Sequence, residues 1–174
     1  MNPIRSIKGT HDILPVDSHN WQTLESIVRK ICARFGYNEI RTPVFEETRL
    51  FSRSVGEETD IVSKEMYSWE DKDGTSLTLR PELTASVVRS FIQHNLGRQA
   101  PLQRLYYMGP LFRRERPQKG RQRQFHQFGI EAFGSENPEQ DAEIIAIAWH
   151  ILDECGLRKE AMLQLNSIGS PKCR

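Results

Sequence analysis

The sequence has few cysteines, no long apolar run and no excess of charge of either sign. Its three cysteines, Cys32, Cys155 and Cys173, lie far apart and outside any CxxC spacing, so they predict neither a disulfide framework nor a zinc site. This usage fits a reducing compartment, and we expect a cytoplasmic protein. No segment approaches the roughly 18 apolar residues of a membrane span, and no signal-peptide pattern opens the chain, so we expect no membrane association.

The composition is otherwise that of an ordinary soluble domain, with 37% hydrophobic and 27% charged residues over 174 positions. Apolar residues at spacings of three and four predict helices at 18–35, 80–96 and 137–155. The start and stop signals are Asp17 or Ser18 with Gly36 for the first, Pro81 and Glu82 with Gly97 for the second, and Asn137, Pro138 and Gln140 with Gly156 for the third.

Between these helices the pattern is typical of strands. We expect a strand at 37–45, placed at an edge because Pro43 cannot donate to a ladder. Hairpins are predicted from 65–79, turning at Asp73-Gly74, and from 103–113 and 122–133, and a last strand at 161–167. Strands joined mostly by hairpins indicate an α+β fold, a mainly antiparallel sheet flanked by helices.

The strongest concentration of charge lies in the second hairpin. Residues 113–123 hold six cations and one acid, Glu115. Guanidinium groups suit phosphate, because they supply charge and two parallel hydrogen bonds. Taken alone, such a loop is more often a solvated charged turn than a binding site.

The returning strand favours the binding interpretation. Side chains alternate between the two faces of a strand, so one face carries Arg121, Arg123, Phe125, Gln127, Gly129 and Glu131. That face suits a ligand floor: arginine for phosphate, an aromatic ring for a base, a glycine that leaves room, and an amide and a carboxylate for a polar ligand. The other face, which includes His126, could pack beneath a helix. If the turn centres near Gln118, Arg113 joins the ligand face.

Glu82 and Thr84 form a second candidate site. A carboxylate in the first turn of a helix is sufficiently explained by the helix dipole, yet it could also hold an ammonium group. The five histidines show no metal-ligand spacing, and each is more readily a surface or packed residue than a catalyst. Tyr106 and Tyr107 could equally belong to the core.

The segment 109–125 resembles motif 2 of the class II aminoacyl-tRNA synthetases, an Arg-x-Glu strand, a loop and an Arg-x-x-x-Phe return. The run 116–127 is similar to histidyl-tRNA synthetases in particular. So are residues 7–9 with Asp12 and Pro15, and the segments 77–82 and 165–170. The helix at 18–35 and the Pro43 strand resemble motif 1, the dimerisation element. The resemblance covers essentially the whole chain and implies the class II catalytic-domain fold.

It also implies a histidine–tRNA ligase, in which histidine reacts with ATP to give histidyl-adenylate and is then transferred to tRNA(His). Arg113 is then expected to stabilise the α-phosphate as the catalytic residue. The implied ATP-binding residues are Arg113, Glu115, Arg121 and Phe125; the histidine-binding residues are Glu82, Thr84, Arg113, Gln127 and Glu131; and the residues against the tRNA acceptor end are Arg114, Arg116, Gln118 and Lys119. The expected partners are ATP, Mg²⁺, L-histidine, tRNA(His) and, in the full-length protein, a second copy of the chain. No metal ligand is assigned.

Motif 3, the histidine-specific segment and the anticodon-binding domain have no counterpart in the sequence. We therefore expect residues 1–174 to be the N-terminal part of the catalytic domain, a truncated chain unable to complete adenylation by itself.

Three alternatives remain. The main one is the histidine-sensing regulatory subunit of ATP phosphoribosyltransferase, a synthetase paralogue that has no need of the basic loop. A plain α+β nucleic-acid-binding domain would leave Gln127 and Glu131 unexplained. A class II synthetase of another specificity fits the Gln-Phe-His-Gln run less well.

Overall fold

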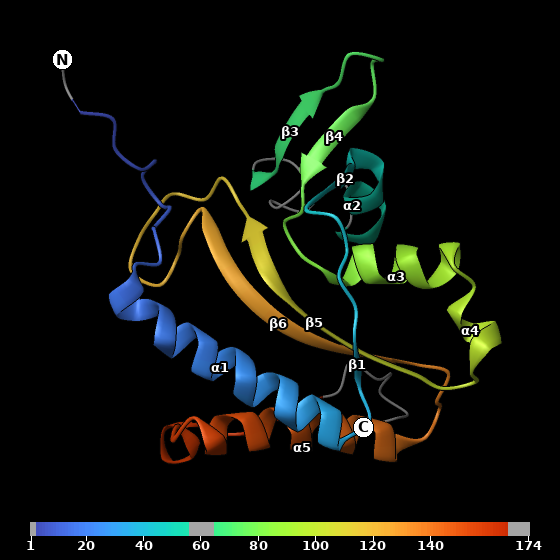
Figure 1. Ribbon diagram of the computed structural model, residues 1–174. Helices are drawn as coiled ribbons and strands as arrows, with labels where there is room; N and C mark the ends of the chain where they lie inside the picture. The colour runs from blue at the N-terminus through green and yellow to red at the C-terminus, as the bar shows by residue number, and fades with distance from the viewer. Residues whose placement is uncertain (1–2, 56–64, 167–174) are drawn as a thin grey trace.

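The computed structural model describes residues 3–55 and 65–166, which form two three-stranded sheets with helices packed around them (Figure 1). The helices are α1 (Pro15–Arg34), α2 (Thr48–Val55), α3 (Thr84–Gln93), α4 (Leu96–Gln99), α5 (Pro138–Glu154) and the 3₁₀ turn η2 (Arg158–Glu160). The strands are β1 (Asn38–Glu39), β2 (Phe45–Glu47), β3 (Tyr67–Glu70), β4 (Ser76–Leu79), β5 (Gln103–Phe112) and β6 (Gln124–Phe133). The α+β prediction is confirmed. No helix in the described ranges is long and apolar enough to cross a membrane.

The first sheet has the order β1-β5-β6 and is dominated by the β5–β6 hairpin. Its antiparallel register runs from Gln103↔Phe133 to Phe112↔Gln124 without a bulge, so the turn centres at Gln118 as predicted. β1 pairs with β5 in parallel. Because opposed residues share a face, the register places the odd-numbered side chains of both strands together.

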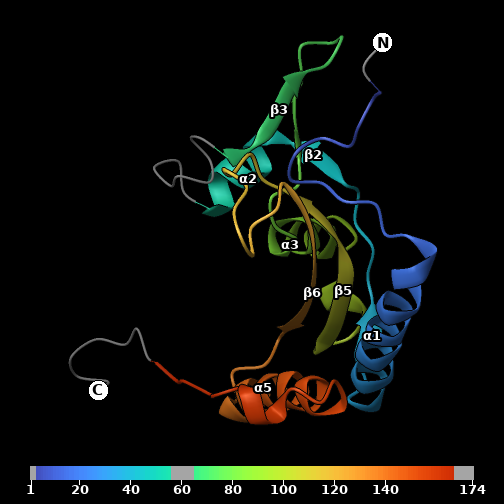
Figure 2. The same ribbon diagram turned by 90° about the vertical axis from the view of Figure 1, so that its left-hand side faces the viewer.

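Each face of this hairpin packs against different helices. The even face carries Tyr106 into a core shared with α1 and α5, whose members include Val28, Ile31, Cys32, Ile147 and Ile151. α1 and α5 pack against each other, and the turned view shows α1 along one side of the hairpin and α5 beneath it (Figures 1 and 2). The odd face carries Leu105, Tyr107 and Leu111 against Leu83 and Val87 at the start of α3. On β6, Ile130 packs against the core shared with α1 and α5, as predicted for the even face, whereas Phe128 on the same face is 41% exposed.

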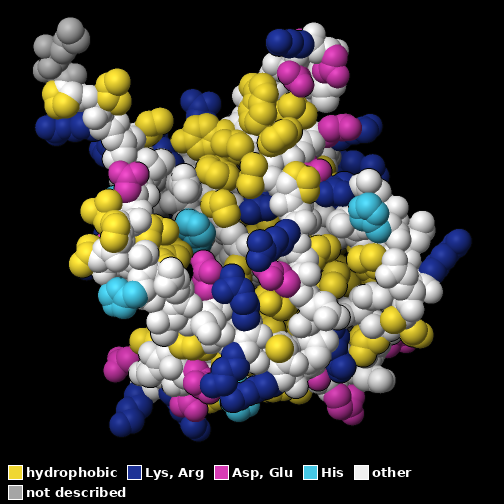
Figure 3. All heavy atoms as spheres, in the orientation of Figure 1, with side chains coloured by type: hydrophobic (Ala, Val, Ile, Leu, Met, Phe, Trp, Pro, Cys, Tyr) yellow, Lys and Arg dark blue, Asp and Glu magenta, His cyan; other side chains and the backbone are white. Residues whose placement is uncertain are grey.

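The second sheet has the order β2-β4-β3 and contains the predicted 65–79 hairpin. Thr78 lies fully buried at its centre, and its hydroxyl bonds to those of Thr48 and Ser68 at 2.8 and 2.7 Å. On the outside Phe45 and Trp69 contact each other with ring centres 6.0 Å apart. Hydrophobic side chains gather near the base of this hairpin (Figure 3).

The boundaries of two predicted helices were wrong. α1 begins at Pro15, without a side-chain cap, instead of after Asp17 or Ser18. The fixed φ of proline suits the first helical position, and Asp17 falls within the first turn instead. The second helix was predicted over 80–96, but α3 begins at Thr84 and ends at Gln93. Asn95 then takes a left-handed conformation (φ 50°), and Gly97, expected to follow the helix, lies inside α4.

Two predicted strands also differ from the structure. Of the 37–45 segment, only Asn38 and Glu39 in β1 and Phe45, the first residue of β2, lie in strands, each strand at a sheet edge, and Pro43 lies between them. Residues 161–166 pair with no other strand in the described ranges, and residue 167 lies outside them. Alternating side chains predict a strand only if a partner edge is within reach, and this segment follows η2 away from both sheets (Figure 2).

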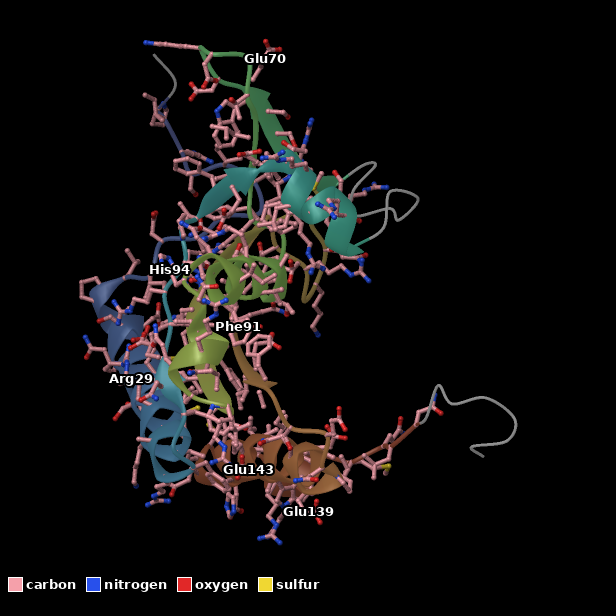
Figure 4. All side chains as sticks on the ribbon, turned by 90° about the vertical axis from the view of Figure 1, so that its right-hand side faces the viewer. Arg29, Glu70, Phe91, His94, Glu139 and Glu143 are labelled. Atoms are coloured by element: carbon pink, nitrogen blue, oxygen red, sulfur yellow. The ribbon has the colours of Figure 1, made fainter. Side chains whose placement is uncertain are left out.

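The third helix, α5, has the predicted bounds, but Gln140 does not complete a capping box. Its amide donates to the Tyr37 hydroxyl at 2.8 Å and to Glu143 at 2.9 Å, while Glu143 pairs with Arg104 of β5. Glu143 lies on the side of α5 that faces the sheet, whereas Glu139 lies on the opposite side (Figure 4). This polar network joins α5 to the segment after α1 and to β5, and so holds the helical layer beneath the hairpin.

Candidate active site

At one end of the odd face, the structure brings together the residues suited to phosphate. Arg113 follows β5, and its backbone N–H donates to the carbonyl of Arg123 at 2.9 Å, which closes the neck of the loop. Its Nε donates to the carbonyl of Pro81 at 3.0 Å, and its guanidinium lies 5.3 Å from the ring centre of Phe125. The Arg113 guanidinium group is thus held by the backbone before α3 and by an aromatic ring. Its terminal nitrogens are left to bind a ligand or a carboxylate.

Glu115 joins this cationic end of the site. Its side chain is only 13% exposed, and it lies 3.0 Å from the Nη1 of Arg121 and 3.8 Å from the Nη1 of Arg113. One carboxylate therefore orients two guanidinium groups from opposite limbs of the loop. A partly buried arrangement of this kind offers preorganised positive charge, because the cost of orienting the groups is met before an anion binds.

The other end of the odd face is acidic. The Thr84 hydroxyl donates to Oε1 of Glu131 at 2.8 Å, and the Tyr107 hydroxyl donates to the same oxygen at 3.1 Å. The structure gives the second carboxylate oxygen of Glu131 no hydrogen bond within the described ranges. Such an oxygen suits a donor on a bound ligand.

Glu82 lies beside this acidic end. Its carboxylate accepts the N–H of Ala85 at 3.0 Å and so caps the start of α3. Burial raises the pKa of Glu82 above its ordinary value, and the charge of Glu131 raises it further, while the Ala85 and Thr84 N–H groups and the charge of Arg113 lower it. A half-buried carboxylate between a cation and an acid, outside the helix proper, goes beyond the plain helix-dipole explanation.

Tyr107 is the site residue that sequence analysis did not identify. Only 8% of it is exposed, and burial raises the pKa of its hydroxyl to about 12, so the hydroxyl keeps its proton and donates a hydrogen bond to Glu131 throughout the neutral range. A tyrosine in an apolar strand is indistinguishable from a core residue by pattern alone. The cross-strand pairing of Tyr107 with Gly129 gives the signal, and this becomes visible once the hairpin register is known.

Gly129 was predicted to leave room for a ligand, and that interpretation was wrong. A Cβ added there would lie 2.3 Å from the Tyr107 ring, so the tyrosine fills the space. Gln127 is exposed and opposes Gly109, between the acidic and cationic ends. The predicted ATP and histidine residues thus lie on the odd face of the hairpin, on the loop that joins its strands, or at the start of α3.

The four residues predicted to meet tRNA lie along the connecting loop. Arg116, Gln118 and Lys119 are exposed, and Gln118 forms an isolated bridge with Arg121 that closes the tip. Arg114 turns the other way. Its backbone N–H donates to the carbonyl of Glu65 at 2.6 Å, and its guanidinium lies 5.7 Å from the ring centre of Tyr67.

The histidines take no part in this site. His126 lies on the helix-packed face, with its ring edge-on to Trp21 at 4.8 Å, and burial lowers its pKa. No group of three or more His, Cys, Asp or Glu side chains in the part of the chain that the structure describes could hold a metal ion.

Comparison with known proteins places this geometry in a family. The sequence profile of the family described as Histidyl-tRNA synthetase matches residues 9–169. The histidine–tRNA ligase of Solibacter usitatus (strain Ellin6076) is 56% identical over 171 residues, which make up 98% of this chain and 41% of that protein. The chain thus spans well under half the length of this curated relative.

Solved structures agree. The crystal structure of apo S. aureus histidyl-tRNA synthetase matches with a TM-score of 0.75 at 44% identity, covering 90% of this chain and 36% of that one. A Bacillus halodurans structure described as an ATP phosphoribosyltransferase regulatory subunit/histidyl-tRNA synthetase has the same TM-score at 26% identity, with 90% and 40% covered. Since the family profile matches nearly all of the sequence, the chain belongs to the histidyl-tRNA synthetase family.

Proposed function

We propose that this chain carries the ATP-binding and histidine-binding surfaces of a histidine–tRNA ligase, as the N-terminal part of a class II catalytic domain containing motifs 1 and 2. One observation carries the proposal. The odd face of a single hairpin presents a guanidinium cluster at Arg113 and, further along, the carboxylate of Glu131, with Glu82 of the segment before α3 beside it. Adenylation needs both, because its substrates are a polyphosphate and an amino acid with an ammonium group.

In the first half-reaction, a carboxylate oxygen of histidine attacks the α-phosphorus of ATP, and pyrophosphate leaves as histidyl-adenylate forms. Negative charge grows on the α-phosphoryl oxygens in the transition state. Arg113 would stabilise that charge with terminal nitrogens already oriented by Pro81 and Phe125. Glu115 and Arg121 would hold the nucleotide, and Phe125 would offer its ring to the adenine.

The histidine substrate would lie toward the acidic end. Glu82, with the hydroxyl of Thr84 nearby, would bind the ammonium group, and Gln127 would supply an amide on the path to the phosphate site. Glu131 would accept an N–H of the substrate on its free oxygen. The two hydroxyls that bond its other oxygen fix the direction in which that free oxygen points.

Mg²⁺ would arrive with ATP, whose phosphate oxygens are its preferred partners, and would neutralise part of the phosphate charge.

In the second half-reaction, the exposed loop residues Arg116, Gln118 and Lys119, with Arg114 at the base, would meet the acceptor end of tRNA(His). Cations on such a loop contact phosphates and position the nucleic acid. We also propose that the motif 1 region, α1 together with the Pro43 segment, supports a homodimer. The exposed Leu14 just before α1, the exposed Val16 on α1 and the exposed Val44 support this surface.

Calorimetric titration of the chain with ATP and Mg²⁺, with and without histidine, tests the proposal. Arg113→Ala should lose nucleotide binding, because the variant removes the only guanidinium held by both Pro81 and Phe125 within the described ranges. Arg114→Ala is the matched control. It removes a neighbouring cation that lies over Tyr67 instead, so ATP affinity should stay within about twofold of wild type.

Each outcome has a consequence. Loss of ATP binding in Arg113→Ala alone supports the ligase site. Equal losses in both variants would mean that the loop binds nucleotide only by general charge. Histidine binding without any nucleotide binding would favour the histidine-sensing regulatory subunit, and no binding of either ligand by the folded chain would overturn the proposal for these residues.

A further inference from the structure

The segment before α1 forms a tight turn that is seated on the motif 2 loop. The backbone N–H and the hydroxyl of Thr10 both donate to the carbonyl of Ile7, at 2.9 and 2.8 Å. Gly9 takes φ +88° within this turn, a conformation that side chains rarely adopt. Lys8 therefore occupies the outer corner of a backbone turn defined by these hydrogen bonds.

The turn contacts both limbs of the loop, more than a hundred residues away in sequence. The Gly9 carbonyl accepts the N–H groups of Arg123 and Gln124, at 2.7 and 3.1 Å, where the loop returns to β6. A Cβ on Gly9 would lie 2.9 Å from Cγ of Arg123 and 3.0 Å from Cγ of Pro117 on the outgoing limb. Gly9 is itself buried, so the turn braces the neck of the loop (Figure 1).

This arrangement adds charge to the loop surface. Arg5 and Lys8 are exposed, and Asp12 is the one acid between residues 3 and 14. Consecutive Cα atoms are about 3.8 Å apart, so the Lys8 ammonium can lie within a screening length, roughly 8–10 Å, of the loop neck. The cations of the turn and those of the loop then act on the same bound polyanion.

We infer that the turn at residues 7–10 is a second element of the RNA-binding surface, with Lys8 contacting the phosphodiester backbone of the tRNA acceptor stem and Gly9 fixing the loop beside it. The inference rests on the proposed function, because it takes tRNA as the partner of the loop. It adds residues from outside motif 2 and assigns them two separable tasks, charge and bracing.

The charge is tested by measuring the affinity of the chain for tRNA(His) transcript over a series of salt concentrations. Lys8→Ala should weaken binding at low salt and reduce the slope of log K against log[salt] by about 0.9, the value for one phosphate contact on duplex nucleic acid. The ratio of wild-type to variant affinity should then narrow about threefold between roughly 50 and 200 mM salt. Lys72→Ala, in the turn between β3 and β4, is the control of equal charge and should leave the slope unchanged.

The bracing is tested with a pair of glycines. Gly9→Ala introduces both an unfavourable φ and a clash with the loop, whereas Gly36→Ala introduces an unfavourable φ (+74°) with nothing within 4 Å of the new Cβ. Gly9→Ala should lower RNA affinity severalfold at every salt concentration, and Gly36→Ala should lower stability without changing RNA affinity.

The failures can be told apart. If wild type does not bind the transcript, both the tRNA part of the proposed function and this inference are overturned. If wild type binds, and both Lys8→Ala and Gly9→Ala match it in affinity and salt slope, only the inference fails. Equal losses in Gly9→Ala and Gly36→Ala would show that bracing is only general stability.

Discussion

At the scale of single residues, the acidic end of the site works against the stability of the fold. The raised pKa of Glu82 means that the folded chain releases this proton less readily than the unfolded chain does. Ionised Glu82 therefore disfavours folding at neutral pH. A carboxylate kept in such surroundings is typical of a functional position, where binding is gained at the expense of stability.

We predict that Glu82→Gln stabilises the fold at neutral pH and weakens histidine binding about tenfold to a hundredfold, since a hydrogen bond to a charged group contributes about 1.5–3 kcal/mol. The amide oxygen still accepts the Ala85 N–H, so the helix cap survives. The stabilisation should vanish as the pH falls below the ordinary carboxyl value of 4.5, because both states are then protonated. Thermal unfolding between pH 3 and 8 and histidine titration at pH 7 measure the two effects.

Glu70→Gln is the control, because Glu70 is exposed at the β3–β4 hairpin (Figure 4). The stability and the histidine affinity of the Glu70→Gln variant should equal those of wild type at each pH. A Glu82→Gln variant less stable than wild type at pH 7 would show that Glu82 is structural after all.

Residues of the site divide into those that the sequence could reveal and those that it could not. Strand alternation was enough to group Arg113, Phe125 and Glu131, because the hairpin has no bulge to break the parity. Strand alternation could not predict that Tyr107 belongs to the site or that its ring fills the space beside Gly129. Whether a glycine opposite a tyrosine is open or filled depends on a side-chain direction that pattern does not encode.

At the scale of elements, Arg80 joins the two sheets. It is 4% exposed, and its guanidinium donates to three backbone carbonyls, those of Thr42, Pro43 and Pro110, at 2.8–3.1 Å. Burial lowers its pKa, but a guanidinium stays charged. Its own backbone bonds to Val44 and Phe112, so one residue connects the segment between β1 and β2 to β5.

Arg80→Met should therefore destabilise the chain by about 3 kcal/mol or more, because it leaves three carbonyls of the interior without donors. The midpoint of urea unfolding, followed by tryptophan fluorescence, measures this loss. Arg41→Met is the matched control. That side chain is 74% exposed beside Glu39, and the control should leave the midpoint almost unchanged. Equal midpoints for both variants would contradict the structural role of Arg80.

The bounds of helices and strands were predicted well where residues within the element itself determine them. The two hairpins and α5 have nearly the predicted bounds, because turn residues and periodicity agree there. The 37–45 strand and the 80–96 helix were wrong in extent because side-chain contacts from distant residues intervene. Arg80 holds 42–43 in place of a ladder, and the Glu82 carboxylate caps a helix that begins after it.

At the scale of the whole molecule, the described part of the chain leaves a strand edge and an apolar segment unpaired. β6 is ten residues long and lies at the edge of its sheet, with β5 on one side only. Residues 161–166 are extended, and Met162 and Leu165 are 81% and 73% exposed. An unpaired edge and an unpaired apolar segment in one chain favour strand addition between copies. Because the edge of one copy would contact the segment of another, each copy keeps one free edge and one free segment. Such contacts can therefore continue beyond two copies.

We therefore predict that the chain forms oligomers larger than dimers as its concentration rises, superimposed on any dimer formed through α1. Sedimentation velocity over a hundredfold range of concentration measures the distribution. Leu165→Lys should reduce the species beyond the dimer severalfold, because a charge on the segment opposes burial against β6. Ile4→Lys, which changes a fully exposed residue far along the chain from this segment, should not. A distribution that ends at two copies for wild type, or that responds equally to both substitutions, would mean that α1 alone governs assembly.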